Sequence, residues 1–381
     1  MTTVPMTPFQ ALLAIGVTGF MLSILAGSIV SWWLWFTGNR PQMLAKRPQA
    51  TVGLIDIIAA VMVLIGLLGV TLVVWRLGTH TTVTESTPAK SASVESTPIE
   101  SAPVESAPVE STPVESAPSK EPAIDPTRDP ANQQEMTEAK FVFSGFAMTA
   151  QLVCVILVTG FICTRTGSKP AMLGWRVDRL RSDLLAGLQC FLMVTPLLLI
   201  LNAILIQWTK IEYEHPIQQM LEKFPWLLGI AFWQASIVAP ISEEFAFRSL
   251  LIGWFESIHF CKGKIESWIV GLQVHGTPAD SGGDADSVVA TGLVASIEDE
   301  PSCPVYHPPW WPAILSGALF GLAHFSYGVS WLSLVVFGVI LGRLYQIRQS
   351  LVPVILVHFL FNSMSMLMMA VKLLLPDNLG T

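Results

Sequence analysis

The stretch that decides the fold reads Ile237-Val-Ala-Pro-Ile-Ser-Glu-Glu-Phe-Ala-Phe-Arg248, and it closes a long apolar run. Glu243 and Glu244 are adjacent in it, and Arg248 follows Glu244 at the spacing of one helical turn. A carboxylate at membrane depth costs roughly 2.5–3.5 kcal/mol on insertion scales, so ionisable residues there usually face a polar cavity and serve a function. Because one arginine cannot easily neutralise two carboxylates, we expect this pair to mark the working site.

The composition is that of a membrane protein. Of the 381 residues, 52% are hydrophobic and 13% are charged, and the mean hydropathy is +0.56. A soluble protein of this length rarely has such a composition. The net charge of −7 gives no basis for nucleic-acid binding. The five cysteines are dispersed without a C-x-x-C pair, and we interpret them as packing residues rather than as a metal or disulfide cluster.

Apolar runs long enough to cross a bilayer predict about eight transmembrane helices. We place them at about 9–36, 54–75, 141–163, 184–208, 226–251, 311–325, 330–345 and 351–375. The pair near 311–345 is the shortest and is joined by a tight polar turn. The predicted fold class is therefore an all-α, polytopic integral membrane protein of the cell membrane, with the lipid bilayer around it.

Loop charges predict the orientation of these helices. Basic residues such as Arg165, Arg176 and Arg348 gather in alternate loops, whereas the short loops on the other side carry only Lys210 and Lys223. By the positive-inside rule, the basic loops are cytoplasmic and both termini are outside. The glutamate pair then lies near the cytoplasmic end of the fifth helix.

Two segments are predicted to lie outside the bilayer. The first holds five consecutive pentapeptides between Val94 and Pro118, and proline at every fifth residue forbids a regular helix. The second is acidic and contains glycine and proline, which predicts a flexible cytoplasmic insertion. The predicted domains are an N-terminal helix pair at 1–80, a disordered acidic spacer outside the membrane at 81–140, and a membrane domain at 141–375 with the insertion at 256–309.

Two further apolar segments carry polar residues on one face. Phe320 and His324 are four residues apart, and so are His358 and Asn362. Residues at this spacing share a helix face, and polar faces in lipid turn inward to meet one another. Each pair alone is explained by hydrogen bonding between helices. Together with the glutamates, however, the two histidines and the asparagine are the parts of a hydrolytic site.

The chemistry of such a set is the activation of water. A carboxylate and an imidazole can activate water directly, or they can bind a metal ion that does so. The remaining histidine and the asparagine amide can donate to a developing oxyanion.

The three motifs resemble the CPBP family of intramembrane endopeptidases, which includes the CAAX prenyl proteases of the Ras-converting type and bacterial bacteriocin-processing and immunity proteins. That family's signature is E-E-x-x-x-R, then F-x-x-x-H, then H-x-x-x-N/D on successive helices. The chain matches each in order, from Glu243 to Arg248, from Phe320 to His324 and from His358 to Asn362. The resemblance covers about 184–375. It implies a CPBP-type bundle acting on a membrane-anchored protein or peptide, CAAX-type or similar.

The resemblance also implies a role for each residue of the motifs. Glu243 is the general base that activates the water, while Glu244 supports it and pairs with Arg248. His324 orients or stabilises the water or a metal. His358 and Asn362 line the oxyanion side, and Phe320 packs under the site.

Whether a metal takes part is left open by the residues. Glu243, His324 and His358 together could hold Zn²⁺ with an open position for water, which favours a metalloprotease. No H-E-x-x-H motif is present to require it, and hydrolysis by glutamate and water alone is equally consistent.

Two other functions are compatible with the same residues. One is a catalytically silent membrane scaffold or bacteriocin-immunity type of binding protein. The other is a transporter that uses the glutamate pair as a proton relay, although no paired interrupted helices indicate inverted repeats.

Overall fold

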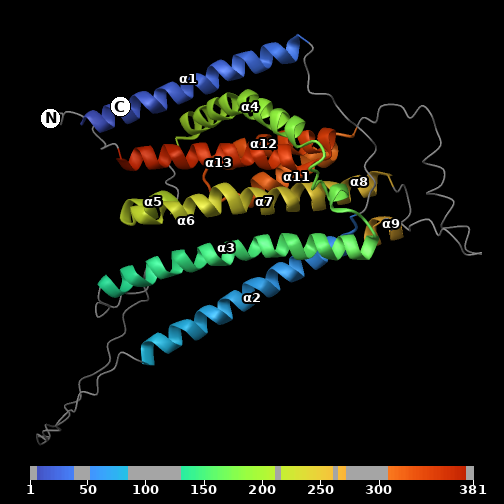
Figure 1. Cartoon of the computed structure of the whole chain (residues 1–381), viewed down its shortest axis with the longest axis horizontal. Helices are drawn as coiled ribbons and strands as arrows, with labels where there is room; N and C mark the ends of the chain where they lie inside the picture. Colours follow the sequence, from blue (N-terminus) through green and yellow to red (C-terminus); the bar gives the residue numbers. More distant parts are fainter. Residues whose placement is uncertain are drawn as a thin grey trace, which may run out of the picture. The chain divides into compact units, whose positions relative to one another are not determined.

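The computed structural model of the chain describes residues 7–37, 52–84, 130–210, 216–260, 265–271 and 308–374 (Figure 1). All the regular elements within these ranges are helices. Seven of them are long and apolar enough to cross a membrane. The predicted all-α polytopic membrane fold is therefore confirmed.

The chain divides into two units, one formed by residues 1–69 with 144–381 and the other by residues 70–143. Every side chain of the candidate site lies in the first unit. The helices are α1 (Pro8–Phe36), α2 (Leu54–Thr84), α3 (Pro130–Thr166), α4 (Leu180–Thr209), α5 (Pro216–Lys223), α6 (Leu228–Phe232), α7 (Ala239–Glu244), α8 (Gly253–Phe260), α9 (Ile265–Val270), α11 (Trp311–Ala323), α12 (Ser330–Arg348) and α13 (Leu351–Leu374).

The eighth predicted span, near 311–325, forms the short helix α11. Its 13 residues rise about 20 Å, which is less than the roughly 30 Å of a bilayer's hydrocarbon core. The helix ends at Ala323, and His324 is the first residue beyond it. The end of α11, rather than its middle, therefore presents the histidine.

The span at Pro225–His259 is one apolar stretch of 35 residues with two π-helical segments in it. They are η3 (Trp233–Val238) and η4 (Phe245–Ile252), and they flank α7 on both sides. Pro240 accounts for the first, because its ring clashes with the carbonyl four residues earlier and interrupts the regular ladder. Such π-helical turns are frequent at functional sites, and α7 is the segment that carries the glutamate pair.

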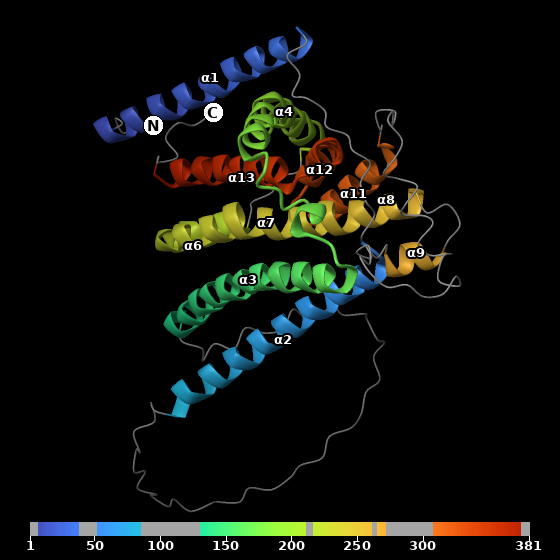
Figure 2. The ribbon, with the colours of Figure 1, turned by 45° about the vertical axis from the view of Figure 1, so that its right-hand side comes forward.

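Helix α13 lies between α4 and the span that contains α7, as both views show (Figures 1 and 2). Its approach to α4 is close because Gly187 has no side chain: a Cβ there would lie 2.9 Å from the Pro353 carbonyl oxygen. Val354 and Val357 of α13 are buried in the apolar core. His358 follows Val357, and this packing turns it toward α7.

Helices α11 and α12 meet along a seam of glycines. A Cβ on Gly338 of α12 would lie 2.8 Å from the Cα of Gly317 on α11. Gly321 would likewise clash with the α12 backbone, 2.8 Å from the Trp331 carbonyl oxygen. This is the close backbone approach that small residues four apart permit between membrane helices, and it fixes α11 against α12.

The predicted insertion at 256–309 begins with ordered helix rather than with flexible chain. Helix α8 runs to Phe260, and α9 follows at Ile265–Val270. Glu256 is buried and accepts a hydrogen bond from Gln346 Nε2 at 3.0 Å. The acidic, Gly- and Pro-containing composition that predicted flexibility belongs to 272–307, which lies outside the described residues.

Helix α9 is held by an ion-pair cluster that loop charges alone did not reveal. Arg165, at the last turn of α3, binds both carboxylate oxygens of Asp56 on α2, at 3.0 and 2.5 Å. The same guanidinium donates to the Val270 carbonyl at 2.5 Å. Gly53 N–H donates to Asp56 Oδ2 at 2.8 Å. We call Asp56, Arg165, Gly53 and the Val270 carbonyl the α2–α3–α9 clamp.

Helix reaches into both edges of the predicted spacer. Helix α2 continues to Thr84, and α3 begins at Pro130. Proline is favourable at the first position of a helix, and the alanine, glutamines and glutamate after it are good helix formers. The pentapeptide repeats themselves, within 85–129, lie outside the described residues.

Candidate active site

Glu244 is the paired member of the two glutamates. It is fully buried, and so is Arg248, one turn along the same helix. Arg248 Nε donates to Glu244 Oε2 at 2.7 Å, and a terminal nitrogen of the guanidinium lies 3.5 Å from Oε1. The other terminal nitrogen donates to Ser316 Oγ of α11 at 3.2 Å. The Arg248 guanidinium is therefore paired with Glu244 and hydrogen-bonded to Ser316 of the neighbouring helix α11.

Glu243 takes no part in the pairing of Glu244 with Arg248. Its side chain is 27% exposed, but its Oε2 atom is buried and has no hydrogen-bond partner among the described residues. Two imidazole nitrogens face that oxygen, His324 Nε2 and His358 Nε2, each 3.9 Å away. These distances are too long for direct hydrogen bonds and suit a group held between the atoms.

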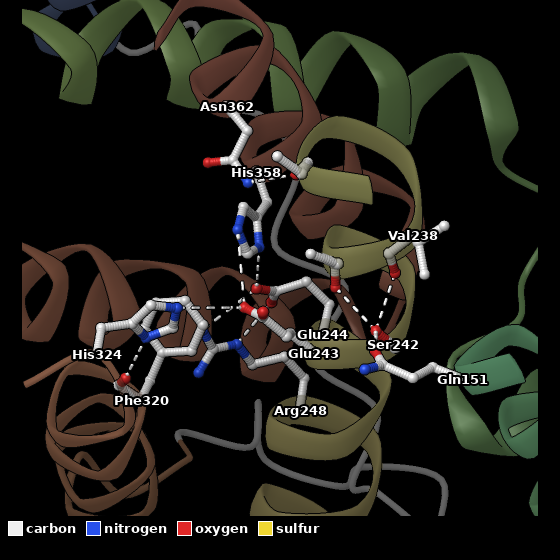
Figure 3. A network of polar contacts seen from close by, with 12 residues as sticks. Gln151, Val238, Ser242, Glu243, Glu244, Arg248, Phe320, His324, His358 and Asn362 are labelled. Atoms are coloured by element: carbon white, nitrogen blue, oxygen red, sulfur yellow. Dashed lines mark hydrogen bonds and ion pairs between the residues drawn. The ribbon is translucent and has the colours of Figure 1, made fainter. Parts of the chain in front are cut away.

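The second nitrogen of each ring is bound, which fixes its protonation pattern (Figure 3). His324 Nδ1 lies 2.8 Å from the Phe320 carbonyl oxygen, and His358 Nδ1 lies 2.9 Å from Glu244 Oε1. A carbonyl and a carboxylate can only accept, so both Nδ1 atoms carry the proton. In the neutral rings, both Nε2 atoms therefore turn a lone pair toward Glu243.

An aromatic floor lies under these groups. The Phe320 ring centroid is 4.9 Å from that of His324 and 5.7 Å from that of His358. The Arg248 guanidinium lies 5.3 Å from the same centroid, within range of a cation–π interaction. Phe337 of α12 meets the His358 ring edge-on at 5.6 Å. These rings keep the polar groups in a low-dielectric setting, where their interactions are strong.

Asn362 lies one turn beyond His358 on α13 and makes a different contact. Its Nδ2 donates to the backbone carbonyl of Ala235, in η3, at 2.7 Å. One of its two amide hydrogens is therefore committed to the backbone. The structure brings Glu243, Glu244, His324 and His358 together over Phe320, and it places Asn362 beside them against the preceding turn of the glutamate helix.

Sequence reasoning missed the residues that hold α7 from its other side. Ser242 Oγ donates to Gln151 Oε1 of α3 at 2.9 Å and lies at the same distance from the Val238 carbonyl (Figure 3). Ser316 of α11, which bonds Arg248, donates in turn to the Phe247 carbonyl at 2.9 Å. The available signal was a polar residue within an apolar run: Ser316 stands alone in its run, and Gln151 shares its run only with hydroxyl side chains such as Thr149.

The donor types suit Zn²⁺, and their spacing in the described structure is wider than that of zinc-bound ligands. Two imidazole nitrogens and one carboxylate oxygen converge, and the second nitrogen of each imidazole is held as in many zinc sites. Ligands of a tetrahedral zinc ion lie about 3.4 Å apart, given bonds of roughly 2.0–2.1 Å, whereas each imidazole Nε2 lies 3.9 Å from Glu243 Oε2. Within the described ranges, no group of three or more His, Cys, Asp or Glu residues has the arrangement of a metal site.

A comparison with family models supports the resemblance seen in the sequence. Residues 288–364 match the family described as type II CAAX prenyl endopeptidase, Rce1-like. The resemblance to CPBP and CAAX proteases that the motifs predicted is thus confirmed over this stretch. The matched stretch contains His324, His358 and Asn362, and the glutamate pair precedes it. No match was found among curated proteins or among solved structures.

Proposed function

We propose that this chain is an intramembrane endopeptidase that hydrolyses peptide bonds of membrane-associated substrates, CAAX-type or similar. One observation carries the proposal. The two histidines of the family-matched stretch turn their Nε2 atoms toward Glu243, a residue outside that stretch. A carboxylate that lacks a charge partner and faces two imidazoles is the arrangement that water activation requires.

Glu243 is the general base of the proposed reaction. A water between its Oε2 and the imidazoles loses a proton to the carboxylate, and the oxygen attacks the substrate carbonyl. The protonated Glu243 then returns that proton to the leaving amine. Both Nε2 atoms lie near enough to accept hydrogen bonds from the water and so to orient it for attack.

Glu244 and Arg248 are assigned a supporting role. The guanidinium neutralises Glu244, so the site holds one net negative carboxylate rather than two. Glu244 Oε1 in turn accepts from His358 Nδ1, which keeps the Nε2 of that ring toward Glu243. This is the orienting part that a carboxylate plays for a catalytic imidazole.

Metal assistance is a separate part of the proposal. Glu243, His324 and His358 are the residues that would hold Zn²⁺, and a bound ion would lower the pKa of its water. The proposal rests on the donor types. Treatment of the purified protein with a chelator, followed by metal analysis, tests it: lost hydrolysis that returns with added Zn²⁺ supports the metal, and full activity of the metal-free protein ends it.

The orientation is also proposed, with both termini outside and the site toward the cytoplasmic side. Loop charge supports it, since Arg176 and Arg179 precede α4 and Arg348 ends α12. Membrane-impermeant labelling of single cysteines in intact cells tests it. A cysteine at 105 should be labelled from outside, and one at Arg176 should not. The reverse pattern would move the site to the outer face.

The activity itself is tested with purified protein in liposomes. A peptide ending in a prenylated cysteine and three further residues is offered, with the unprenylated peptide beside it, and the release of the tripeptide is measured. Wild-type protein should release it, and Glu243→Gln should not. Membrane-protein termini compared between cells with and without the protein extend the test to other substrates. Hydrolysis absent from both assays would favour a binding or scaffold function.

A further inference from the structure

We propose that the turn between α3 and α4 is a binding surface for the phosphate headgroups of anionic phospholipids. Helix α3 ends at Thr166 and α4 begins at Leu180, and we call residues 167–179 the α3–α4 loop. Both flanking helices are long and apolar enough to cross a membrane. The loop therefore lies at the membrane surface, whichever side of the membrane it faces.

The charge of this surface is complementary to anionic lipid. Lys169 and Arg181 are exposed, and the side chains of Arg176 and Arg179 are 26% and 28% exposed. Asp178 is the acid among them, 3.3 Å from Arg176 and 3.6 Å from Arg179. One carboxylate cannot neutralise four basic groups, so the surface stays positive. Anionic lipids attract basic segments beside a membrane-spanning helix, by about fivefold in affinity for each Lys or Arg.

Apolar side chains are exposed between these charges. Val177 is 81% exposed and directly follows Arg176. Leu180 is 46% exposed and stands between Arg179 and Arg181. Segments that lie in the membrane interface combine basic and apolar side chains in this way, with the charges at the phosphates and the apolar groups among the upper acyl carbons. The positive-inside rule requires only the charge, whereas the exposed Val177 and Leu180 indicate contact with the lipid itself.

The inner side of the α3–α4 loop is fixed to the core. Leu173, at the end of the short helix η1 (Pro170–Leu173), is buried, and its carbonyl accepts a hydrogen bond from Ser249 Oγ at 2.8 Å. The Trp175 ring stacks on Phe245, with 5.9 Å between the ring centroids. Both partners belong to η4, which directly follows the glutamate pair. The basic groups are therefore held in place before lipid binds, and bound lipid should stabilise the folded core.

Lipid counting by native mass spectrometry tests the proposal on the full-length protein. The protein is released from micelles that contain either phosphatidylglycerol or phosphatidylcholine, and the affinity for the first bound lipid is measured. Arg176→Gln with Arg179→Gln should lower the affinity for phosphatidylglycerol by about 25-fold and leave that for phosphatidylcholine unchanged. Asp178→Asn, which removes the acid, should raise the affinity for phosphatidylglycerol by about fivefold. The matched control is Lys210→Gln with Lys223→Gln, which removes two charges beyond the other end of α4 and should change neither affinity by more than about twofold.

The thermal unfolding midpoint gives a second readout. Phosphatidylglycerol in place of phosphatidylcholine should raise the midpoint of the wild type by about 2–4 °C, and the Arg176→Gln, Arg179→Gln variant should lose this gain. Glycerol 3-phosphate, which has the headgroup charge without acyl chains, should give no gain. An equal gain from glycerol 3-phosphate would mean a site for free phosphate and would overturn the proposal. So would wild-type lipid affinity in the arginine variant, or an equal loss in the lysine control. Neither readout requires hydrolysis, so this proposal and the proposed function can fail separately.

Discussion

Among the described residues, the α2–α3–α9 clamp and the candidate site each join a carboxylate to a guanidinium, and they differ by one acid. In the α2–α3–α9 clamp, Asp56 meets Arg165, and both carboxylate oxygens and the guanidinium have partners. In the site, two glutamates meet one arginine, and Arg248 binds only Glu244. Glu243 is the acid without a counterpart.

The difference separates a structural pair from a chemical one. A buried charge is tolerated when its partner and its hydrogen bonds are complete, and breaking such a pair is strongly destabilising. The clamp meets these conditions and ties three helices together. In the site, the Glu244–Arg248 pair meets them as well, which leaves Glu243 free to exchange a proton. The extra carboxylate, rather than burial or charge, distinguishes the site.

The largest expected effect is on catalysis. Glu243→Gln should lower kcat by about 10³-fold, because it removes the general base, and it should leave the unfolding midpoint near that of the wild type. Asp56→Asn is the matched change in the clamp. It should keep kcat per folded molecule within about threefold while lowering the midpoint. Peptide hydrolysis and thermal unfolding of both variants test whether Glu243→Gln affects kcat alone and Asp56→Asn affects stability alone. A Glu243→Gln protein with normal kcat would refute the role of Glu243 as the base.

The next effect is on stability at the site. Arg248→Met leaves Glu244 buried without its partner, so the free energy of unfolding should fall by about 3–5 kcal/mol. Denaturant titration in mixed micelles measures the loss. Adding Glu244→Gln to Arg248→Met removes the uncompensated charge and should restore much of the stability. A double variant that is less stable than Arg248→Met would contradict the view that Arg248 stabilises the protein by neutralising Glu244.

A smaller loss is expected from the clamp. Arg165→Met removes the guanidinium from Asp56, which keeps only the Gly53 N–H, and removes the donor to the Val270 carbonyl. The Arg165 side chain is 17% exposed, so water can replace part of what is lost. The free energy of unfolding should fall by about 2 kcal/mol, with kcat of the folded protein unchanged. Hydrogen exchange should rise in α9 first. A loss of kcat without a loss of stability would mean that the clamp acts on the site.

The smallest effect is expected where the same two residue types meet in water. Asp178 pairs with Arg176 before α4, and its side chain is 54% exposed. The hydrogen bond from Arg176 holds the pKa of Asp178 below its ordinary value of 3.8. The stability from this pair is therefore present above the unfolded pKa and lost as the pH falls through the folded one. Asp178→Asn should change the unfolding midpoint by less than is measurable at pH 7.

The parts of the site that sequence could predict are those carried by local spacing. Residues four apart on a helix share a face, so Glu244 with Arg248 and Phe320 with His324 were expected together from the chain alone. Apolar length likewise predicted the spans, apart from the short α11. Which atom of each side chain meets which partner was not predictable, because that depends on how helices distant in sequence pack.

The features that sequence missed are long-range or involve the backbone. Nothing local links Asp56 to Arg165, since these residues are 109 positions apart, and loop charge alone placed Arg165 only on a side of the membrane. The π-helical segments were missed for a different reason. Pro240 predicts an interrupted ladder, but whether the chain kinks or widens there depends on how helices distant in sequence pack against it.

The glycine seam between α11 and α12 makes the position of His324 a property of the main chain. Because Gly317 and Gly338 bring the two backbones together directly, no side chain at these two positions sets the separation of the helices. Lipid-facing residues on both helices can therefore vary without moving the imidazole. A single methyl group at Gly317 cannot be absorbed in this way, since the added atom would meet the α12 backbone. The position of the His324 imidazole is thus insensitive to most substitutions on the lipid-facing surface of α11 and α12. It is sensitive to substitution of the few glycines at which the two backbones meet.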